Sequence, residues 1–429
     1  MNLQRVLVFP AGTEIAYEIH NALKFSKCIE LYGINSIPCH GEFLFERYIN
    51  EDIPFIRHPD FIEKFNEILD KYKIDIVYPA HDTAGLFLTR DTDSIHAKIV
   101  TSPLETVEIC RSKIRTYRFF EGYDFIPKYY PDIKSIEKYP VFIKPDVGQG
   151  AVGAHIANDE AELRCFTSDG KEYAICEYLP GDEYTVDCFT DRSGKVIVCR
   201  PRKRERIKAG IAVRSSLCAA NDDIIRITQA INSKLKFNGA WFFQLKKNAS
   251  GQYRLMEISP RIPGTMATSR VSGINFPLLS IRNMLGLDVD ITDNDVGVTL
   301  DRAFINRYRT NVKYDSVYVK FEGCIYLNEK VNLTLLDFCY QCVNKGIPLY
   351  LITNDMTETR RTLKKLRISD ELFNEIIPVN DLSEIPDHIR GTDPIFITDS
   401  FDDKKEVKDK LGIPVYELDM VESLLDWRM

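Results

Sequence analysis

The feature of this sequence that most constrains its fold is an alternation of short apolar segments with longer amphipathic segments at both ends of the chain. Near the N-terminus, strand-sized runs and helix-like segments follow one another in the order 5–12, 13–27, 28–35, 59–73 and 74–82. Strands that are joined through helices pair in parallel, because the helix returns the chain to the same end of the sheet. Residues 1–110 are therefore expected to form an α/β domain with a parallel, doubly wound sheet.

The middle of the chain has a different pattern. From Ser112 onward, short strands such as PVFIKPD and YTVDCFT are joined by glycine-containing turns, and a helical segment at 222–235 precedes a hairpin. This order is typical of an α+β domain. Beyond Arg309 the alternation of strand and helix returns, which predicts a third domain of the α/β class. The predicted domains are 1–110, 111–310 and 311–429.

Composition excludes several classes of function. The 429 residues are 44% hydrophobic and carry a net charge of −7, so the chain lacks the basic surface of a dedicated nucleic-acid binder. No apolar run approaches the roughly 20 residues that span a bilayer, and no secretion signal is recognisable. Eleven cysteines without a repeating spacing favour reduced thiols and a cytoplasmic location. The expected partners are small molecules rather than nucleic acid or membrane, and the oligomeric state is left open.

A glycine-rich segment follows one of the predicted strands. In VFIKPDVGQGAVGAH, Lys144 ends the strand and Gly148, Gly150 and Gly153 follow it. Glycines let backbone N–H groups close over phosphate oxygens, and a lysine supplies the compensating charge. The lysine precedes the glycines, so the segment is not a Walker A loop, and an ordinary glycine-rich hairpin is an equal alternative. Lys113, further upstream, would by itself be interpreted as a solvated charge on a helix.

The hairpin GAWFFQLKKNASGQYRLMEIS contains the most informative pattern. Residues 248–251 have the composition of a turn, so we expect Lys247 to pair with Gln252. This register places Gln244 opposite Leu255, on the face that also carries Glu257.

An acidic side chain in an apolar strand, with other oxygen ligands near it, is the arrangement that a hard cation bridging phosphates requires. Glu257, Gln244 and Ser259 provide such oxygens, and Arg261 follows with a guanidinium suited to a transferring phosphoryl group. The alternative is a buried salt bridge between Glu257 and Arg261.

Taken in order, these motifs resemble the ATP-grasp superfamily of carboxylate–amine ligases, especially the branch similar to the large chain of carbamoyl-phosphate synthetase. The resemblance covers about residues 1–305 and rests on Lys113, FIKPDVGQGAVG, ICEYLPGDEYTVD and MEISPRIPGT. It implies a pre-ATP-grasp domain followed by an ATP-grasp domain.

The resemblance also implies a role for each motif residue. It assigns Lys113 and Lys144 to the ATP phosphates, and the loop of Gly148, Gln149, Gly150 and Gly153 to the clamp that closes over them. The adenine hinge would be Glu177, Tyr178 and Leu179, and Glu183 would bind the ribose. Gln244 and Glu257 would hold magnesium. Lys144 and Arg261 would act in catalysis. Ser259 stands where the family usually has asparagine in an E-I-N-P-R signature, so a second metal ion would be held partly by water.

The chemistry that the resemblance implies requires ATP and Mg²⁺. A carboxylate is phosphorylated, and an amine-type nucleophile then attacks the acyl phosphate, so that ADP and phosphate are released. Two alternatives remain open, namely a non-catalytic nucleotide-binding scaffold and a bifunctional ligase and phosphatase.

A basic run lies between the hinge and the hairpin. It contains Arg200, Arg202, Lys203, Arg204, Arg206 and Lys208. Such a run is usually a solvated face. The functional alternative is a patch that attracts an anionic, carboxylate-bearing substrate, with Arg214 as a further candidate.

The third predicted domain resembles the haloacid-dehalogenase-like fold. The segment VYVKFEG stands where that family has D-x-D-G-T, so Lys320 and Glu322 replace the two aspartates, and LITND offers Thr353 as the phosphate-binding residue. FITDSFDD offers Asp399, Asp402 and Asp403 as the acidic motif. A lysine cannot form an aspartyl phosphate, so we expect this domain to lack phosphatase chemistry.

Overall fold

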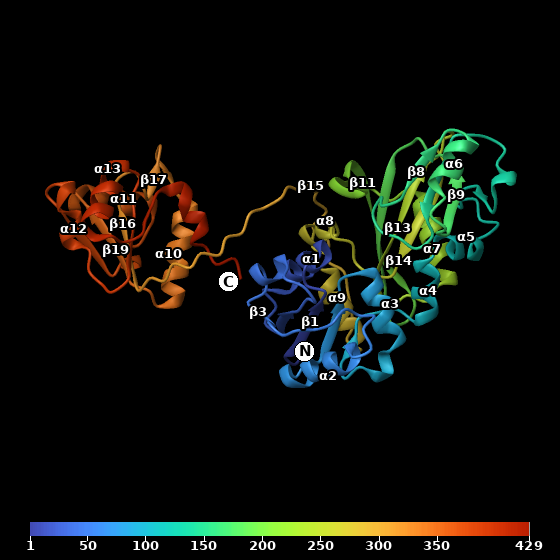
Figure 1. Ribbon diagram of the computed structural model, residues 1–429, viewed down its shortest axis with the longest axis horizontal. Helices are drawn as coiled ribbons and strands as arrows, with labels where there is room; N and C mark the ends of the chain where they lie inside the picture. The colour runs from blue at the N-terminus through green and yellow to red at the C-terminus, as the bar shows by residue number, and fades with distance from the viewer. Residues whose placement is uncertain (429) are drawn as a thin grey trace. The chain divides into compact units, whose positions relative to one another are not determined.

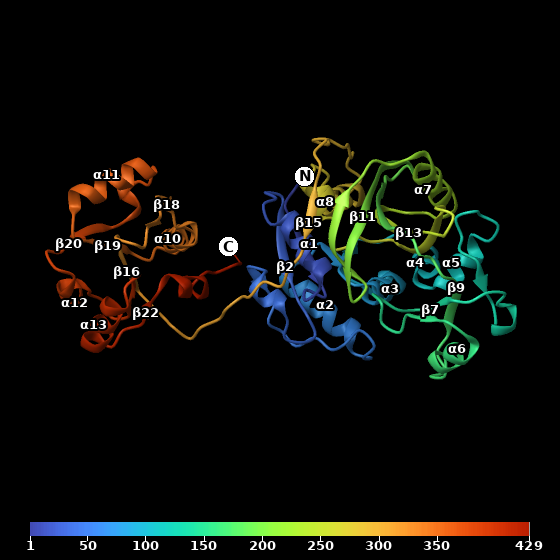
Figure 2. The same ribbon diagram turned by 90° about the horizontal axis from the view of Figure 1, so that it is seen from above.

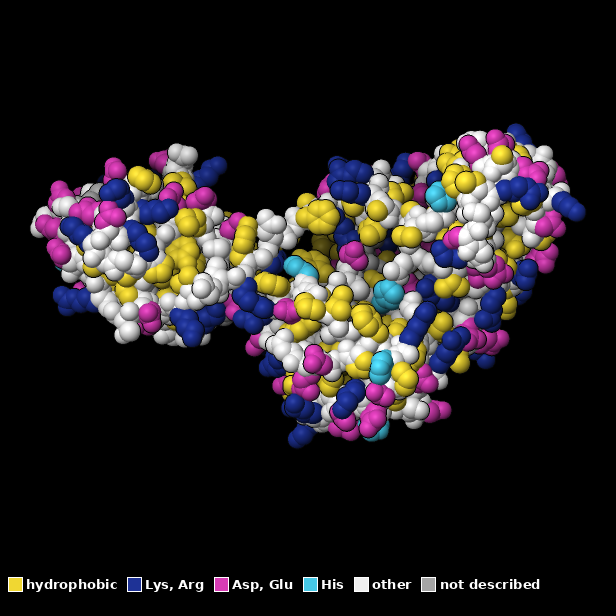
Figure 3. All heavy atoms as spheres, in the orientation of Figure 1, with side chains coloured by type: hydrophobic (Ala, Val, Ile, Leu, Met, Phe, Trp, Pro, Cys, Tyr) yellow, Lys and Arg dark blue, Asp and Glu magenta, His cyan; other side chains and the backbone are white. Residues whose placement is uncertain are grey.

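The structure, a computed structural model, describes residues 1–428. The chain divides into two compact units, Met1–Phe304 and Ile305–Met429 (Figure 1). The three domain boundaries expected from the sequence stay predictions. Among the described residues, no helix is long and apolar enough to cross a membrane. On the face of the molecule in Figure 3, basic and acidic side chains are interspersed, with no broad area of one sign.

The first unit begins with a parallel five-stranded sheet in the order β3-β2-β1-β4-β5. Its elements are β1 Gln4–Phe9, α1 Glu14–Leu23, β2 Ile29–Gly33, β3 Arg47–Tyr48, α2 Phe61–Tyr72, β4 Ile76–Pro79, α3 Asp82–Arg90 and β5 Lys98–Ile99. Val6 and Val8 of β1 pack on the side of α1, whereas Leu7 and Phe9 pack on the side of α2. Helices therefore cover both faces, which confirms the doubly wound sheet predicted for this part of the chain.

Two antiparallel sheets follow in the same unit. The smaller has the order β6-β9-β7-β8, and the larger has the order β14-β13-β10-β11-β12-β15. Their strands are β6 Tyr129–Tyr130, β7 Val141–Pro145, β8 His155–Ala157, β9 Tyr173–Glu177, β10 Glu183–Thr190, β11 Val196–Lys208, β12 Ile211–Leu217, β13 Gly239–Lys247, β14 Tyr253–Ser259 and β15 Thr299–Asp301. The accompanying helices are α4 Leu104–Arg111, α5 Lys113–Phe119, α6 Glu160–Phe166, α7 Asp222–Lys234, α8 Ala267–Val271 and α9 Phe276–Met284. This architecture confirms the predicted α+β arrangement.

One face of the six-stranded sheet is apolar, and the opposite face carries polar side chains such as Gln244 together with the buried Phe189 and Ala240. Helix α7 covers the apolar face, where its isoleucines pack against Val186, Trp241, Phe243 and Leu245 (Figure 2). Side chains alternate along a strand, so the residues between these positions point to the opposite face. Gln244 is one of them, and the predicted polar side of the hairpin is thus turned away from the apolar core beneath α7.

The register predicted for the β13–β14 hairpin is wrong by one residue at the turn. Lys247 pairs with Tyr253 rather than with Gln252. The side-chain oxygen of Asn248 accepts hydrogen bonds from the backbone N–H groups of Ser250 and Gln252, at 3.0 and 2.9 Å. This Asx-type turn encloses three residues instead of four, because Asn248 and Gln252 close it.

A β-bulge then changes the register again. It lies between Gln244 and Leu245 and places Gln244 directly opposite Glu257 instead of Leu255. The bulge inserts one extra residue on β14 and turns Glu257 toward its partner. In the observed register the two predicted metal ligands, Gln244 and Glu257, therefore lie closer together than in the predicted register.

The second unit contains a parallel sheet in the order β20-β19-β16-β21-β22 and a small antiparallel hairpin, β17–β18. Its elements are β16 Ser316–Lys320, β17 Tyr326–Leu327, β18 Lys330–Val331, α10 Leu333–Lys345, β19 Leu349–Thr353, α11 Met356–Leu366, β20 Glu375–Pro378, α12 Ile385–His388, β21 Pro394–Ile397, α13 Phe401–Leu411 and β22 Val415–Tyr416. The alternation predicted beyond Arg309 is confirmed as α/β structure. Its assignment to the haloacid-dehalogenase-like fold stays a prediction.

Candidate active site

The two predicted metal ligands face each other across β13 and β14. Glu257 is partly buried, and Gln244 accepts a hydrogen bond on Oε1 from Arg204, at 2.8 Å. A carboxylate and an amide oxygen on directly paired positions suit a hard cation, although the arginine would share the amide oxygen with it. Within residues 1–428 no group of three or more His, Cys, Asp or Glu side chains could hold a metal ion. A magnesium ion here would therefore depend on Glu257, Gln244 and the oxygens of phosphate and water.

Both predicted phosphate-binding lysines lie near Glu257. Lys144 on β7 donates to the backbone oxygen of Met256 at 2.7 Å, and burial lowers the pKa of Lys144 to about 8. Lys113 begins α5 and donates to the backbone oxygen of Asp146 at 3.2 Å, and burial also lowers the pKa of Lys113. In each case the negative charge of Glu257 acts in the opposite direction and favours the ammonium form.

Arg261 pairs with Asp82, a residue of the parallel sheet region, and not with Glu257. Its Nε and NH2 groups lie 2.7 and 2.6 Å from the two carboxylate oxygens of Asp82, which also accepts from the Ser259 hydroxyl at 3.0 Å. Burial alone would raise the pKa of Asp82, but the charges of Arg261 and Arg111 hold it well below its usual range. The alternative of a Glu257–Arg261 salt bridge is therefore wrong.

The glycine loop lies between β7 and β8 and adopts a conformation that needs glycine. Gly150 and Gly153 have φ angles of 60° and 73°. A Cβ atom on Gly150 would lie 3.2 Å from the backbone oxygen of Ala209, and one on Gly210 would lie 2.2 Å from the backbone nitrogen of Ala151. The loop is therefore packed closely against the turn between β11 and β12.

The hinge residues lie at the end of β9, whose last residue is Glu177. Leu179 is buried, Tyr178 is exposed, and a side-chain oxygen of Glu177 accepts from the backbone N–H of Lys128 at 3.0 Å. The predicted ribose ligand, Glu183, is nearly buried and forms ion pairs instead.

Those ion pairs involve two basic residues. Glu183 contacts Arg204 directly, and its second oxygen lies 3.6 Å from Lys246. Glu183 is therefore held on the polar face of the large sheet, beside Gln244.

A cavity of about 100 Å³ lies beside Lys113, Glu257 and Arg261, whereas Lys144, Gln244 and the hinge residues do not line it. Its lining includes His81, Asp82, Lys113, Gln149, Glu257 and Arg261. Burial lowers the pKa of His81, and its Nδ1 accepts from the backbone N–H of Thr83 at 3.2 Å, so the neutral ring carries its proton on Nε2.

His81 and Asp82 were missed by the sequence analysis. They follow the carboxyl end of β4, and ligands bind at this end of the strands in open parallel sheets, which was the available signal.

The basic run is not a single solvated face. Arg202 is 1% exposed, and Arg204 is also buried. The more exposed members form ion pairs, Lys203 with Asp182 at 2.8 Å and Arg206 with Asp301 at 2.7 Å.

The acidic motif of the second unit surrounds Lys320 at the end of β16. The ammonium of Lys320 lies 2.8 Å from Asp403 and 3.2 Å from Asp399, whereas Asp402 is exposed in the first turn of α13. Burial alone would lower the pKa of Lys320, but the hydrogen bonds to these carboxylates raise it. The lysine is therefore charged and occupies the space between the two carboxylates.

Glu322 fills the neighbouring position. Its Oε1 accepts from the Thr353 hydroxyl at 2.6 Å and from the backbone N–H of Asn354 at 3.0 Å. The predicted phosphate-binding threonine is thus engaged with a carboxylate of the chain itself.

The fold of the first unit is that of the ATP-grasp proteins. Residues 170–303 match the family described as ATP-grasp in the biosynthetic pathway with Ter operon. The chain is 27% identical over 175 residues to the N-terminal section of the large chain of carbamoyl phosphate synthase from Methanopyrus kandleri. That match covers 37% of this chain and 31% of the relative, so it spans about a third of the relative's length.

Solved structures agree with this fold. The L-amino acid ligase from Bacillus licheniformis is 16% identical with a TM-score of 0.53, and the match covers 66% of this chain and 75% of the ligase. The N5-carboxyaminoimidazole synthetase from Staphylococcus aureus in complex with ADP is 11% identical with a TM-score of 0.56, covering 70% and 82%.

Proposed function

We propose that this chain is an ATP- and Mg²⁺-dependent ligase that activates a carboxylate as an acyl phosphate and joins it to an amine-type nucleophile. The observation that carries the proposal is the convergence of Lys113, Lys144, Glu257 and Arg261 on one region of the first unit. The names of the relatives, an amino acid ligase and a carbamoyl phosphate synthase among them, support the same reaction class.

Each predicted residue has a role in this proposal. Lys113 and Lys144 bind the ATP phosphates beneath the loop of residues 148–153, Glu177 to Leu179 hold the adenine, and Glu183 is the candidate for the ribose. Glu257 and Gln244, with Ser259 in support, are the residues that would hold magnesium. When bound, the metal would supply positive charge to the phosphate oxygens.

The chemistry has two steps. An oxygen of the substrate carboxylate attacks the γ-phosphorus, and the bond to ADP breaks. The amine nitrogen then attacks the acyl carbon, the bond to phosphate breaks, and the amine loses a proton. Arg261 and the two lysines stabilise negative charge during the first step, because fixed positive groups in a site that excludes water lower the energy of a charged transition state.

Asp82 has the role of a positioning residue. Its two hydrogen bonds fix the plane of the Arg261 guanidinium, which otherwise has several rotamers. His81 presents an Nε2–H donor at the same cavity, where it can meet an oxygen of the substrate.

For the second unit we propose a role without phosphoryl transfer. Lys320 pairs with both Asp399 and Asp403, so a divalent cation would have to displace a buried ammonium. We propose a structural, substrate-presenting or partner-binding role for this unit. For the whole chain we propose a cytoplasmic location and small-molecule substrates.

The test measures phosphate and ADP release from the full chain with Mg²⁺ and ATP. A panel of carboxylates is combined with a panel of amines, and each panel is also supplied alone. A ligase releases both products in proportion to the coupled product, and only with a matching pair. ATP binding without release for any pair would favour the non-catalytic scaffold instead.

A further inference from the structure

Three buried donor groups without a hydrogen-bond partner lie together on the large sheet. They are NH1 of Arg202, Nε of Arg204 and the hydroxyl of Ser215. Arg202 and Arg204 are two residues apart on β11, and Ser215 on β12 pairs directly with Arg204, so all three side chains share one face. Buried polar groups are nearly always satisfied, and a group of unsatisfied donors on neighbouring positions indicates a missing acceptor.

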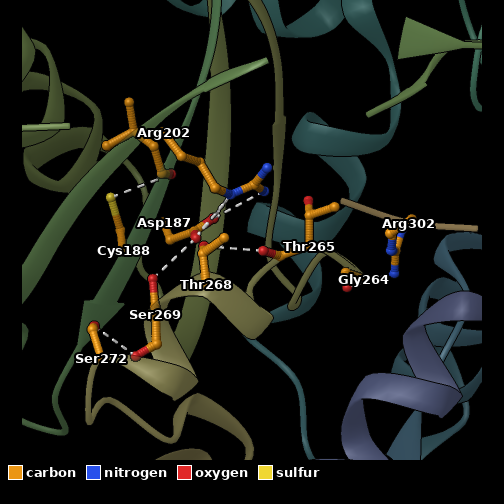
Figure 4. Close-up of polar contacts among 10 residues, drawn as sticks. Asp187, Cys188, Arg202, Gly264, Thr265, Thr268, Ser269, Ser272 and Arg302 are labelled. Atoms are coloured by element: carbon orange, nitrogen blue, oxygen red, sulfur yellow. Dashed lines mark hydrogen bonds and ion pairs between the residues drawn. The ribbon is translucent and has the colours of Figure 1, made fainter. Parts of the chain in front are cut away.

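Two of the three arginines near these donors form ion pairs, and the third does not. Arg202 is compensated by Asp187, whose oxygens lie 3.0 to 3.3 Å from its Nε and NH2 (Figure 4). Arg204 is compensated by Glu183. The third guanidinium is that of Arg302, which forms no ion pair among the described residues and donates to the backbone oxygen of Gly264 at 2.6 Å.

Arg302 and Arg202 are close enough to influence each other. Burial lowers the pKa of Arg302, and the charge of Arg202 lowers it further, whereas Glu14 and Glu18 act in the opposite direction. In the view of Figure 4, Gly264 and Thr265 lie between the two arginines. An anion placed between these guanidiniums would relieve their repulsion and satisfy the free donors.

The group is continuous with the candidate active site. NH1 of Arg204 donates to Oε1 of Gln244 at 2.8 Å, and Gln244 is paired with Glu257. An anion held by the free Nε of Arg204 would therefore lie one side chain away from the position proposed for magnesium. Because Arg204 also contacts Glu183, the proposed ribose ligand, an anion at this place is assigned to a substrate only if it binds in addition to the nucleotide.

We propose that Arg202, Arg204, Ser215 and Arg302 form the binding site for a carboxylate group of the substrate. The proposal rests on the proposed ligase function for the identity of the ligand, although the site itself is defined by its own donors. The substrate class is a carboxylic acid whose oxyanion is recognised by a paired guanidinium cluster. The donors are inaccessible in this conformation, so entry of the substrate would require the segment that contains Gly264 and Thr265 to move.

Only part of the basic run belongs to the proposed carboxylate site. Arg202 and Arg204 belong to it, whereas Lys203 and Arg206 point into solvent and pair with local carboxylates. Within the run, only the buried Arg202 and Arg204 are therefore proposed to bind an anionic substrate.

The test uses the full chain and two small anions, succinate and inorganic phosphate, as probes. Calorimetry first measures the affinity for Mg²⁺ and AMPPNP, and each probe is then titrated into the nucleotide-saturated protein, so that the phosphate-binding lysines are already occupied. The variants are Arg302→Gln and Ser215→Ala, and the matched control is Arg226→Gln, whose exposed guanidinium pairs with Asp124 on the α7 side of the sheet. Succinate reports a carboxylate site, and binding of phosphate alone would assign the site to phosphate and overturn the substrate class.

The expected result is that Arg302→Gln weakens succinate binding about 10-fold or more, the effect of losing one charge-assisted hydrogen bond. Ser215→Ala is expected to weaken it less, without any loss of thermal stability, because the hydroxyl has no partner in the protein to lose. AMPPNP affinity stays within about twofold in both variants and in Arg226→Gln, which also keeps its succinate affinity.

Two results would overturn the site. One is equal succinate affinity in the wild type and in Arg302→Gln, and the other is the absence of succinate binding in a wild type that binds AMPPNP. If AMPPNP does not bind, the ligase proposal fails, and the probes are titrated without nucleotide. Succinate binding that still depends on Arg302 would then uphold the anion site by itself.

Discussion

Replacing Asp82 with asparagine tests how the parallel sheet region takes part in phosphoryl transfer. The side chains of Asp82 and Arg261 are only 19% and 22% exposed, and two hydrogen bonds of 2.7 and 2.6 Å join them. Breaking a fully buried ion pair costs about 3–5 kcal/mol, and breaking an exposed pair costs at most about 1 kcal/mol. The intermediate burial places Asp82→Asn at about 2 kcal/mol of lost stability at pH 7.

The effect on stability depends on pH in a defined direction. The folded pKa of Asp82 is depressed, so its contribution is present above the pKa of the unfolded carboxyl, about 3.9, and is lost as pH falls through the folded value. The difference between wild type and Asp82→Asn, measured by urea denaturation, should therefore be constant between pH 6 and 8 and shrink below about pH 4.

The effect on activity should separate binding from turnover. Asp82 holds Arg261 in place for the transferring phosphoryl group, so ATP-dependent product formation should fall about 100-fold while AMPPNP affinity changes little. The matched control is Asp124→Asn, which removes an exposed bidentate pair with Arg226 and should cost less than about 1 kcal/mol with full activity. A loss of stability in Asp82→Asn no larger than in Asp124→Asn, together with normal turnover, would refute the positioning role.

Three further predictions concern charge. Glu257→Gln should keep the fold and lower turnover about 100- to 1000-fold, measured as ADP release, and normal release would remove Glu257 from the site. Lys144 has a pKa of about 8, so the AMPPNP affinity of the wild type should fall between pH 7 and 9 as the ammonium is lost. The Lys144→Ala variant should bind AMPPNP more weakly at pH 7, with an affinity that hardly changes with pH. A variant whose affinity falls with pH as in the wild type would contradict this. The full chain should hydrolyse no p-nitrophenyl phosphate with Mg²⁺ above background, because Lys320 occupies the acidic pocket, and hydrolysis abolished by Asp399→Asn would make the protein bifunctional.

The strands of the large hairpin could be predicted from the sequence, but their register could not. The predicted pairing sets Leu255 opposite Gln244 on the polar face, whereas the observed pairing sets it opposite Leu245 in the apolar core. The choice depends on the Asn248 side chain at the turn and on a bulge beside Gln244, and neither leaves a clear signal in composition.

The candidate site was predictable where its residues belong to one motif, and not where it depends on distant contacts. Lys144 and Glu257 were named from local patterns and Lys113 from the family resemblance, and the structure places them near one another. Asp82 is 179 residues away from Arg261, and no local pattern connects them. The burial of Arg202 likewise depends on Asp187 from a neighbouring strand, so in the sequence this arginine looks like any other charge in a basic run.

The contact between Asp82 and Arg261 has a consequence for how this chain can be divided or recombined. The family match begins at residue 170, so a fragment with its boundaries there would contain Arg261 but neither Asp82 nor the two lysines. A chimera that exchanges the N-terminal sheet for that of a relative would need an acidic residue at the start of α3 to keep the guanidinium aligned. The smallest exchangeable segment is therefore set by this ion pair and is larger than the stretch that sequence similarity marks out.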